Sequence, residues 1–118
     1  MAENCIFCKI IAGEIPSQTV YQDELVTAFR DIAPIAPTHI LIVPNQHIVS
    51  LAGMSEAQAG VLGRMVKVAN DLAASEGVDE SGYRFITNVG PDSGQAVFHL
   101  HFHLLGGRPL GGMVRRAS

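Results

Sequence analysis

Hydrophobic and polar residues alternate strictly near the end of the chain, over residues 98–104, within the apolar-flanked stretch 97–105. An alternation with a period of two is typical of a β-strand, because successive side chains along a strand point to opposite faces. Gly106 and Gly107 follow directly and favour an end to the strand at that point. The pattern predicts one face of three imidazoles, His99, His101 and His103, and one apolar face, Leu100, Phe102 and Leu104.

A different periodicity predicts one long helix in the middle of the chain. Ser55 and Gln58 form a capping-box signature, in which each side chain can bond the backbone of the other, so the helix is expected to begin here. Gly77 is placed as the left-handed residue that follows a helix end. Apolar residues recur between them at three- and four-residue spacing and predict one buried stripe: Val61, Leu62, Met65, Val68, Ala69, Leu72 and Ala73.

The remaining elements are expected to be short. Residues 5–11 predict a short helix with Ile6 and Ile10 on one face, ended by Gly13 and Pro16, which could act as a lid. Residues 19–21 and 25–31 predict a hairpin, and residues 83–89 a further strand. The run Thr38–Pro44 is an apolar stretch of strand length bounded by prolines.

Composition limits the classes of function. A chain of 118 residues is expected to form one domain. Its formal charge of -3, without a basic run, argues against a nucleic-acid partner. No apolar run approaches the roughly 18 residues of a membrane span, and the N-terminus offers no basic leader, so we expect a cytoplasmic protein without a membrane partner.

The row of histidines is the strongest candidate for chemistry. The unperturbed pKa of imidazole, about 6.5, lies near neutrality, so the three rings could serve as nucleophile, proton donor and stabiliser of charge. Neighbours on one strand face lie about 6.6 to 6.8 Å apart, so each ring can touch the next but the three cannot converge. His101 is flanked on both sides and is the candidate nucleophile. Zinc shared by two of the rings, or a satisfied core histidine, are the alternatives.

Two further features could carry chemistry. Cys5 and Cys8 lie too close together to staple a fold, and in a reducing compartment such a pair indicates metal or redox chemistry. Residues 90–95 form a loop with two glycines that feeds into the histidine strand. Such a loop can turn backbone N–H groups toward an anion, although an ordinary hairpin turn is the alternative.

The histidine strand, read as His99-Leu100-His101-Phe102-His103-Leu104-Leu105, resembles the signature of the histidine triad (HIT) family. The resemblance implies a single HIT domain over residues 1–118, with residues 105–118 as a C-terminal tail. It implies an α+β fold with a five-stranded antiparallel sheet, one long and one short helix, and a homodimer whose sheets join. Nearly the whole chain resembles the Hint branch, in Phe7-Cys8-Lys9-Ile10-Ile11, Glu14-Ile15-Pro16, Ala28-Phe29-Arg30-Asp31-Ile32, Ala36-Pro37-Thr38-His39, Gly94-Gln95 and Leu105-Gly106-Gly107-Arg108.

The resemblance also implies an activity. Members of this branch hydrolyse the P–N bond of purine nucleoside 5′-phosphoramidates, such as adenosine 5′-monophosphoramidate, through a nucleotidyl-histidine, and some also cleave aminoacyl-adenylates. The expected substrates are therefore AMP or GMP derivatives, and catalysis is expected to need no cofactor. His103 favours water as the acceptor, because family transferases have glutamine at that position. A dinucleoside polyphosphate hydrolase and a nucleotide-binding regulatory module are the alternatives.

Roles carry over residue by residue from the family motif. His101 would attack the α-phosphorus, His103 and the backbone of Gly94 and Gln95 would donate to the phosphoryl oxygens, and His39 would hydrogen-bond along the row. Asp31 is expected to bind the ribose hydroxyls. The remaining nucleotide-binding residues implied are Phe7, Phe29 and Ile32 around the base and Asn88 near the sugar and phosphate.

The resemblance further implies a structural zinc ion, which Cys5 and Cys8 would hold with His47 and His99. The second ring nitrogen of His99 would then orient His101. The chain also departs from relatives in two places. Ala96 stands where some have a serine beside the leaving group, and the tail lacks the tryptophan that some extend across the dimer.

Overall fold

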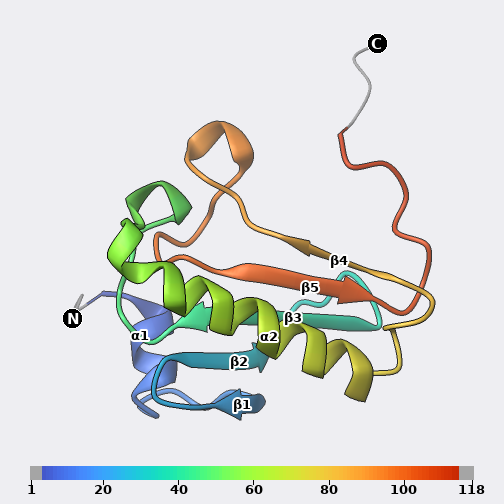
Figure 1. Cartoon of the computed structure of the whole chain (residues 1–118), viewed down its shortest axis with the longest axis horizontal. Coiled ribbons are helices and arrows are strands. Elements are labelled where there is room, and N and C mark those ends of the chain that lie inside the picture. The colour runs from blue at the N-terminus through green and yellow to red at the C-terminus, as the bar shows by residue number, and fades with distance from the viewer. Residues whose placement is uncertain (1–3, 115–118) are drawn as a thin grey trace.

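The computed structural model describes residues 4–114, which form one five-stranded antiparallel sheet in the order β1-β2-β3-β5-β4. A long helix crosses one face of the sheet (Figure 1). The predicted α+β fold, with one long and one short helix, is confirmed. The strands are β1 (Thr19–Gln22), β2 (Val26–Arg30), β3 (Thr38–Pro44), β4 (Tyr83–Ile86) and β5 (Phe102–Gly106); the helices are α1 (Ile6–Ile11) and α2 (Ala59–Ser75).

Helix α2 forms where its apolar stripe and its end signals predict it. The Ser55 N–H donates to Gln58 Oε1 at 2.8 Å, within a 3-10 turn, Glu56–Gln58, that leads into the helix. Gly77 has φ +74°, the left-handed conformation expected after the helix end. Met65 and Val68 lie at the centre of the core beneath the sheet. Within residues 4–114 no helix is long and apolar enough to span a membrane.

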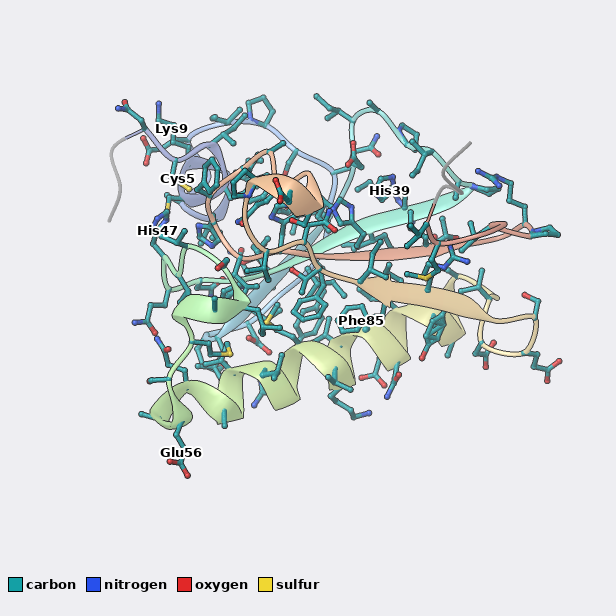
Figure 2. The ribbon with its side chains drawn as sticks, turned by 90° about the horizontal axis from the view of Figure 1, so that it is seen from above. Cys5, Lys9, His39, His47, Glu56 and Phe85 are labelled. Atoms are coloured by element: carbon teal, nitrogen blue, oxygen red, sulfur yellow. The ribbon has the colours of Figure 1, made fainter. Side chains whose placement is uncertain are left out.

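The two faces of the sheet are packed differently. Ile40 and Leu104 pair across β3 and β5 and belong to the core under α2. Leu41 pairs with His103 and packs on the opposite face, where α1 lies. Figure 2 shows Phe85 between the sheet and α2, whereas Cys5, His39 and His47 lie on the other side of the sheet. The predicted division into an apolar face and an imidazole face is therefore confirmed.

The strand predicted over residues 97–105 is shorter than expected. Strand β5 begins at Phe102, because the preceding backbone bonds to loops: the Leu100 N–H donates to Ile48 O at 2.6 Å, and Thr87 Oγ1 donates to His101 O at 2.7 Å. For the same reason β4 ends at Ile86 instead of continuing to residue 89. At its other end, β5 extends to Gly106, one residue beyond the predicted strand and into the tail of residues 105–118 that the resemblance implies. Residues 115–118 of that tail lie outside the described part.

Helix α1 forms as predicted but turns a different face inward. Ile6 is 47% exposed, whereas Phe7 and Cys8 are buried. The Cys5 side chain caps the helix by accepting the Cys8 N–H at 3.3 Å, which turns Phe7 and Cys8 toward the sheet. Gly13, with φ +78°, follows the helix end.

Candidate active site

One ring nitrogen of His101 is engaged in a hydrogen bond, and the other has no hydrogen-bond partner among residues 4–114. It is buried, and its Nδ1 lies 2.8 Å from the His99 carbonyl oxygen. Because a carbonyl oxygen only accepts, Nδ1 carries the proton and donates it. The lone pair of a neutral imidazole then lies on Nε2, so His101 has the electronic form that a nucleophile requires.

A chain of hydrogen bonds fixes the protons of the next two rings. The Ile35 N–H donates to His39 Nδ1 at 3.2 Å, so His39 carries its proton on Nε2. That nitrogen lies 2.9 Å from His103 Nδ1 and 3.4 Å from Asp31 Oδ2. His103 therefore accepts on Nδ1 and holds its own proton on Nε2. The hydrogen bonds therefore run from Ile35 to His39 and from His39 to His103, a chain that we call the relay. The Nε2–H of His103 is left at its end.

The electrostatics keep this relay neutral. Burial, and to a lesser extent the neighbouring imidazoles of His101 and His39, lower the pKa of His103 to about 4. The Asp31 carboxylate opposes this shift only in part. Burial also lowers the pKa of His39, again opposed by Asp31. A neutral pair is what the tautomers require, because a protonated His103 would have no lone pair to accept the His39 proton.

An apolar cavity of about 260 Å³ lies next to the histidines, between α1 and β2. Phe7 and Phe29 form its walls, with ring centroids 5.4 Å apart and edges packed against faces. Asp31 and Ile32 lie at its rim, and Ile32 is 98% exposed. The cavity thus brings together four of the predicted nucleotide-binding residues. Further lining residues not predicted from the sequence are Ile6, Ile10, Ile15, Pro16, Ser17, Arg30, Leu41 and Val97.

Some of these additional residues had a signal in the sequence. Leu41 follows His39 by two positions in β3, so the strand period places both on one face. Val97 precedes His99 by two positions, although β5 does not extend that far. Ile15 and Pro16 lie in the loop after α1, whose path depends on tertiary contacts that a local pattern does not encode.

The ring of Phe7 connects this cavity to the row of histidines. Its centroid lies 5.1 Å from that of His101, with the planes at 83°. His101 and His103 are in contact in turn, with ring centroids 5.1 Å apart. A flat ring bound in the cavity would therefore lie one side chain away from the candidate nucleophile.

The loop before the histidines is held by Gln95. Its amide donates to Val49 O at 2.8 Å and to Val97 O at 3.1 Å, and its Oε1 accepts the Gly90 N–H at 2.8 Å. Gly94 has φ +87°, which favours glycine at this turn. The backbone N–H groups of Gly94 and Gln95 both donate within the loop, at 3.0 and 3.3 Å.

The roles predicted for this region are not tested by these contacts. The engaged N–H groups of Gly94 and Gln95 show how the loop keeps its shape, and phosphate binding by this backbone stays a prediction. Asn88 lies half-buried just after β4. Its predicted place near the sugar and phosphate also stays a prediction.

Four possible metal ligands meet beside the row. Cys5 Sγ and Cys8 Sγ lie 3.3 and 3.5 Å from His99 Nδ1, and His47 Nδ1 lies 3.4 Å from Cys8 Sγ and 3.2 Å from His99 Nδ1. A tetrahedral zinc ion separates sulfur from nitrogen ligands by about 3.6 Å and two nitrogen ligands by about 3.3 Å. The donor set and spacing therefore fit such an ion.

Comparison with known proteins decides the family. The HIT domain family model matches residues 12–110 of the chain. The chain belongs to the HIT family. A protein of Escherichia coli strain K12 named purine nucleoside phosphoramidase is 58% identical over 114 residues, which cover 97% of this chain and 96% of the relative. Protein HitA of Neisseria gonorrhoeae is 44% identical over 104 residues, covering 88% and 96%.

Solved structures of HIT proteins have the same fold. A HIT family hydrolase from Clostridium thermocellum superposes with a TM-score of 0.93 at 49% identity, covering 98% of this chain and 100% of the other. A histidine triad protein from Clostridium difficile gives 0.92 at 44% identity, covering 97% and 99%.

This HIT protein has, among its described residues, two clusters of side chains that could bind a metal. The tautomers of their histidines show which cluster offers a lone pair to an ion. In the first, His99 Nε2 donates to Pro44 O at 2.8 Å, which leaves the Nδ1 lone pair directed at the cysteines. In the second, formed by Asp31, His39 and His103, the Ile35 N–H occupies His39 Nδ1, so its Nε2 carries a proton where a metal would bind. The second cluster therefore suits proton transfer.

The contact of His99 with Pro44 corrects one prediction. The second ring nitrogen of His99 bonds Pro44 O, so it does not orient His101. The His99 backbone carbonyl does so instead.

Proposed function

We propose that the protein hydrolyses the P–N bond of purine nucleoside 5′-phosphoramidates to an amine and a nucleoside monophosphate. The observation that carries the proposal is the Nε2 lone pair that the Nδ1 bond leaves to His101, whose ring contacts both the neutral His103 and Phe7, a wall of the apolar cavity. The relative from Escherichia coli, named purine nucleoside phosphoramidase, supports the same reaction.

In the first step His101 Nε2 attacks the α-phosphorus, and the P–N bond to the amine breaks. The electron pair of that bond leaves with the amine, which takes up a proton from a histidine or from water, because Ala96 has no hydroxyl to supply one. His103 Nε2–H donates to a phosphoryl oxygen, where negative charge develops. The His99 carbonyl accepts from Nδ1–H and stabilises the cationic phospho-imidazole.

In the second step water attacks the phosphorus of the nucleotidyl-histidine. The bond between phosphorus and Nε2 breaks, its electron pair returns to His101, and water releases a proton that balances the one taken by the amine. No step needs a metal. Aminoacyl-adenylates fit the same sequence, with a carboxylate in place of the amine as leaving group.

The cavity supports a purine nucleotide as substrate. The base would lie in the cavity that Phe7 and Phe29 line, with Ile32 closing over it and Asp31 accepting from the ribose hydroxyls. Because the walls are apolar, shape and stacking would contribute most of the affinity for the base. Asn88 and the loop at Gly94 and Gln95 would lie on the phosphate side.

We propose that Cys5, Cys8, His47 and His99 hold one structural zinc ion per chain, on the strength of the fit described above. Both cysteines are buried thiols that contact His99 and His47, and thiol ligands of this kind are typical of a reducing compartment such as the cytoplasm. Elemental analysis of protein purified without chelator tests the metal, and less than a stoichiometric amount after growth with zinc would contradict it.

We further propose a homodimer in which the two sheets join through β4. In the described part of the chain β4 pairs with β5 alone, and its four residues are only half-buried. An open edge of this kind can add a strand from a second copy. Sedimentation equilibrium tests this, and a monomer at micromolar concentration would refute it.

The enzyme proposal is tested with adenosine 5′-phosphoramidate that releases a fluorescent amine. We expect amine release, and an AMP adduct on His101 in protein quenched early in turnover. His101→Asn should lower turnover by roughly 10⁴-fold or more while AMP still binds. Lys67→Gln, an exposed change on α2, is the matched control and should act like wild type.

Three results would contradict the proposal. Turnover by His101→Asn at the wild-type rate would refute the assignment of His101 as the nucleophile. Faster hydrolysis of diadenosine polyphosphate than of the phosphoramidate would favour a dinucleoside polyphosphate hydrolase. Tight AMP binding with neither adduct nor amine release would favour a regulatory module.

A further inference from the structure

Phe7 lies between the two cysteines of the candidate metal cluster. Cys5 caps α1 and Cys8 lies in its first turn, so the helix that carries Phe7 has thiols on both sides of that residue. The ring itself lines the apolar cavity and contacts His99 and His101, with centroids 5.9 and 5.1 Å apart. One short helix thus connects the metal cluster to the substrate cavity.

Helix α1 depends on tertiary contacts. It has six residues, far fewer than the roughly 12 to 15 that a helix needs for marginal stability in water. Apart from the cluster, its contacts with the sheet include the Phe7 ring on Phe29 and one bond from Gln22 Nε2 to Ile11 O at 3.2 Å. The thiols add three contacts of 3.3 to 3.5 Å to His99 and His47.

The histidine side of the cluster is anchored independently. His99 donates through Nε2 to Pro44 O at 2.8 Å, and the following residue, Leu100, donates its N–H to Ile48 O at 2.6 Å. Neither bond involves a thiol or a metal. The His99 carbonyl that accepts from His101 is therefore held whether or not a metal is bound.

We propose that the metal cluster is a clamp that holds Phe7 against the substrate cavity and so sets the affinity for the base, while the chemical step does not depend on it. Cys5, Cys8 and His47 are then positioning residues that act through Phe7. The inference rests on the proposed hydrolase function and on the proposed zinc ion. It assigns to the cluster a role in substrate binding.

The clamp predicts an effect that depends on the substrate. Without metal, α1 loosens and Phe7 no longer packs on the base. Loss of one aromatic stacking partner weakens binding of a base by about tenfold, so KM for adenosine 5′-phosphoramidate should rise by that factor with little change in kcat. The phosphoramidate of 1-O-methylribose has no base, and its KM should stay the same. A loss of general structure would change both substrates and would lower kcat.

The first experiment compares protein stripped with a chelator, the same protein reloaded with Zn²⁺, and untreated protein. Both substrates are assayed, and hydrogen exchange is followed at the amides of Lys9 and Ala12, which bond within α1. We expect faster exchange there in the stripped protein, unchanged exchange in α2, and full recovery on reloading. Equal KM values and equal exchange with and without metal would overturn the proposal.

Two sets of variants make the test independent of chelation. His47→Asn removes one ligand from a half-buried loop position and should reproduce the stripped protein, whereas His47→Cys keeps four donors and should restore the wild-type KM. Phe7→Ala changes no ligand, so it should raise KM in the loaded protein, and removing the metal should then add nothing. If metal removal raises the KM of Phe7→Ala by the same factor as it raises the KM of the wild-type protein, the clamp does not act through Phe7 and the proposal fails.

The outcomes separate this inference from the function on which it rests. Absence of turnover on either phosphoramidate, with metal bound, refutes the hydrolase. Turnover with the same ratio of KM values in all metal states refutes the clamp and leaves the hydrolase intact. If the stripped protein unfolds, seen as rapid exchange in α2, the cluster holds the whole fold, and the clamp is refuted while the hydrolase is not.

Discussion

The low pKa of His103 makes stability depend on pH in a calculable way. Burial and the neighbouring imidazoles lower its pKa from 6.5 to about 4 in the folded protein. The unfolded chain has the ordinary value, so between these two pH values it binds a proton that the folded chain does not. Stability must therefore fall as the pH falls from about 6.5 to about 4, and level off below.

The magnitude follows from the same two values. Each pH unit inside that window costs about 1.4 kcal/mol per proton, so the total approaches roughly 3 kcal/mol. Between pH 7 and pH 5 alone, the free energy of unfolding should drop by about 2 kcal/mol because of His103. This difference is larger than the usual error of a denaturation experiment.

The assay is urea unfolding at several pH values, at one protein concentration, for wild type and His103→Gln. Glutamine can still accept the His39 proton but does not titrate. The lowered pKa values of His39 and His99 affect both proteins, so the difference between the two curves isolates His103. Curves that stay parallel from pH 7 to pH 5, within about 0.5 kcal/mol, would refute the neutral relay.

Three further predictions concern single positions. Gly107 has φ +96° and a Cβ there would lie 2.8 Å from Pro37 Cβ, so Gly107→Ala should cost about 1 to 3 kcal/mol in urea unfolding. Gly63→Ala, in open space on α2, is its matched control and should stabilise by about 1 kcal/mol. Met65→Ala should cost about 2 to 5 kcal/mol by thermal unfolding, because Met65 is fully buried, and no loss would contradict its place in the core. Asp31→Asn should raise KM about tenfold for adenosine 5′-phosphoramidate but little for its 2′,3′-dideoxy analogue; equal effects would remove the ribose contact.

The periodic parts of the fold could be predicted from the sequence. Helix α2 carries its start signal at Ser55, its end signal at Gly77 and a continuous apolar stripe, all of them local. The alternation of Leu104 and His103 likewise determined the two faces of β5. Local patterns suffice here because each is set by the geometry of one element.

The rest depends on partners distant in the chain. The start of β5 is set by loops, since Ile48 takes the N–H of Leu100 that a longer strand would have used. The sequence brought His99 and His101 together but could not show that a backbone carbonyl joins them. The inward face of α1 follows from the contacts of Cys5 and Cys8 with His99, more than 90 residues away.

Main-chain groups determine the tautomers of His99, His101 and His39. Pro44 O, His99 O and the Ile35 N–H each determine which nitrogen of a ring carries hydrogen. Side chains nearby can therefore change in evolution without exchanging the roles of the rings. Every substitution keeps the backbone carbonyl, and every substitution except proline keeps the backbone N–H. A graft of the three histidines onto another scaffold would need those three backbone groups as well, or its imidazoles would settle in the wrong tautomers.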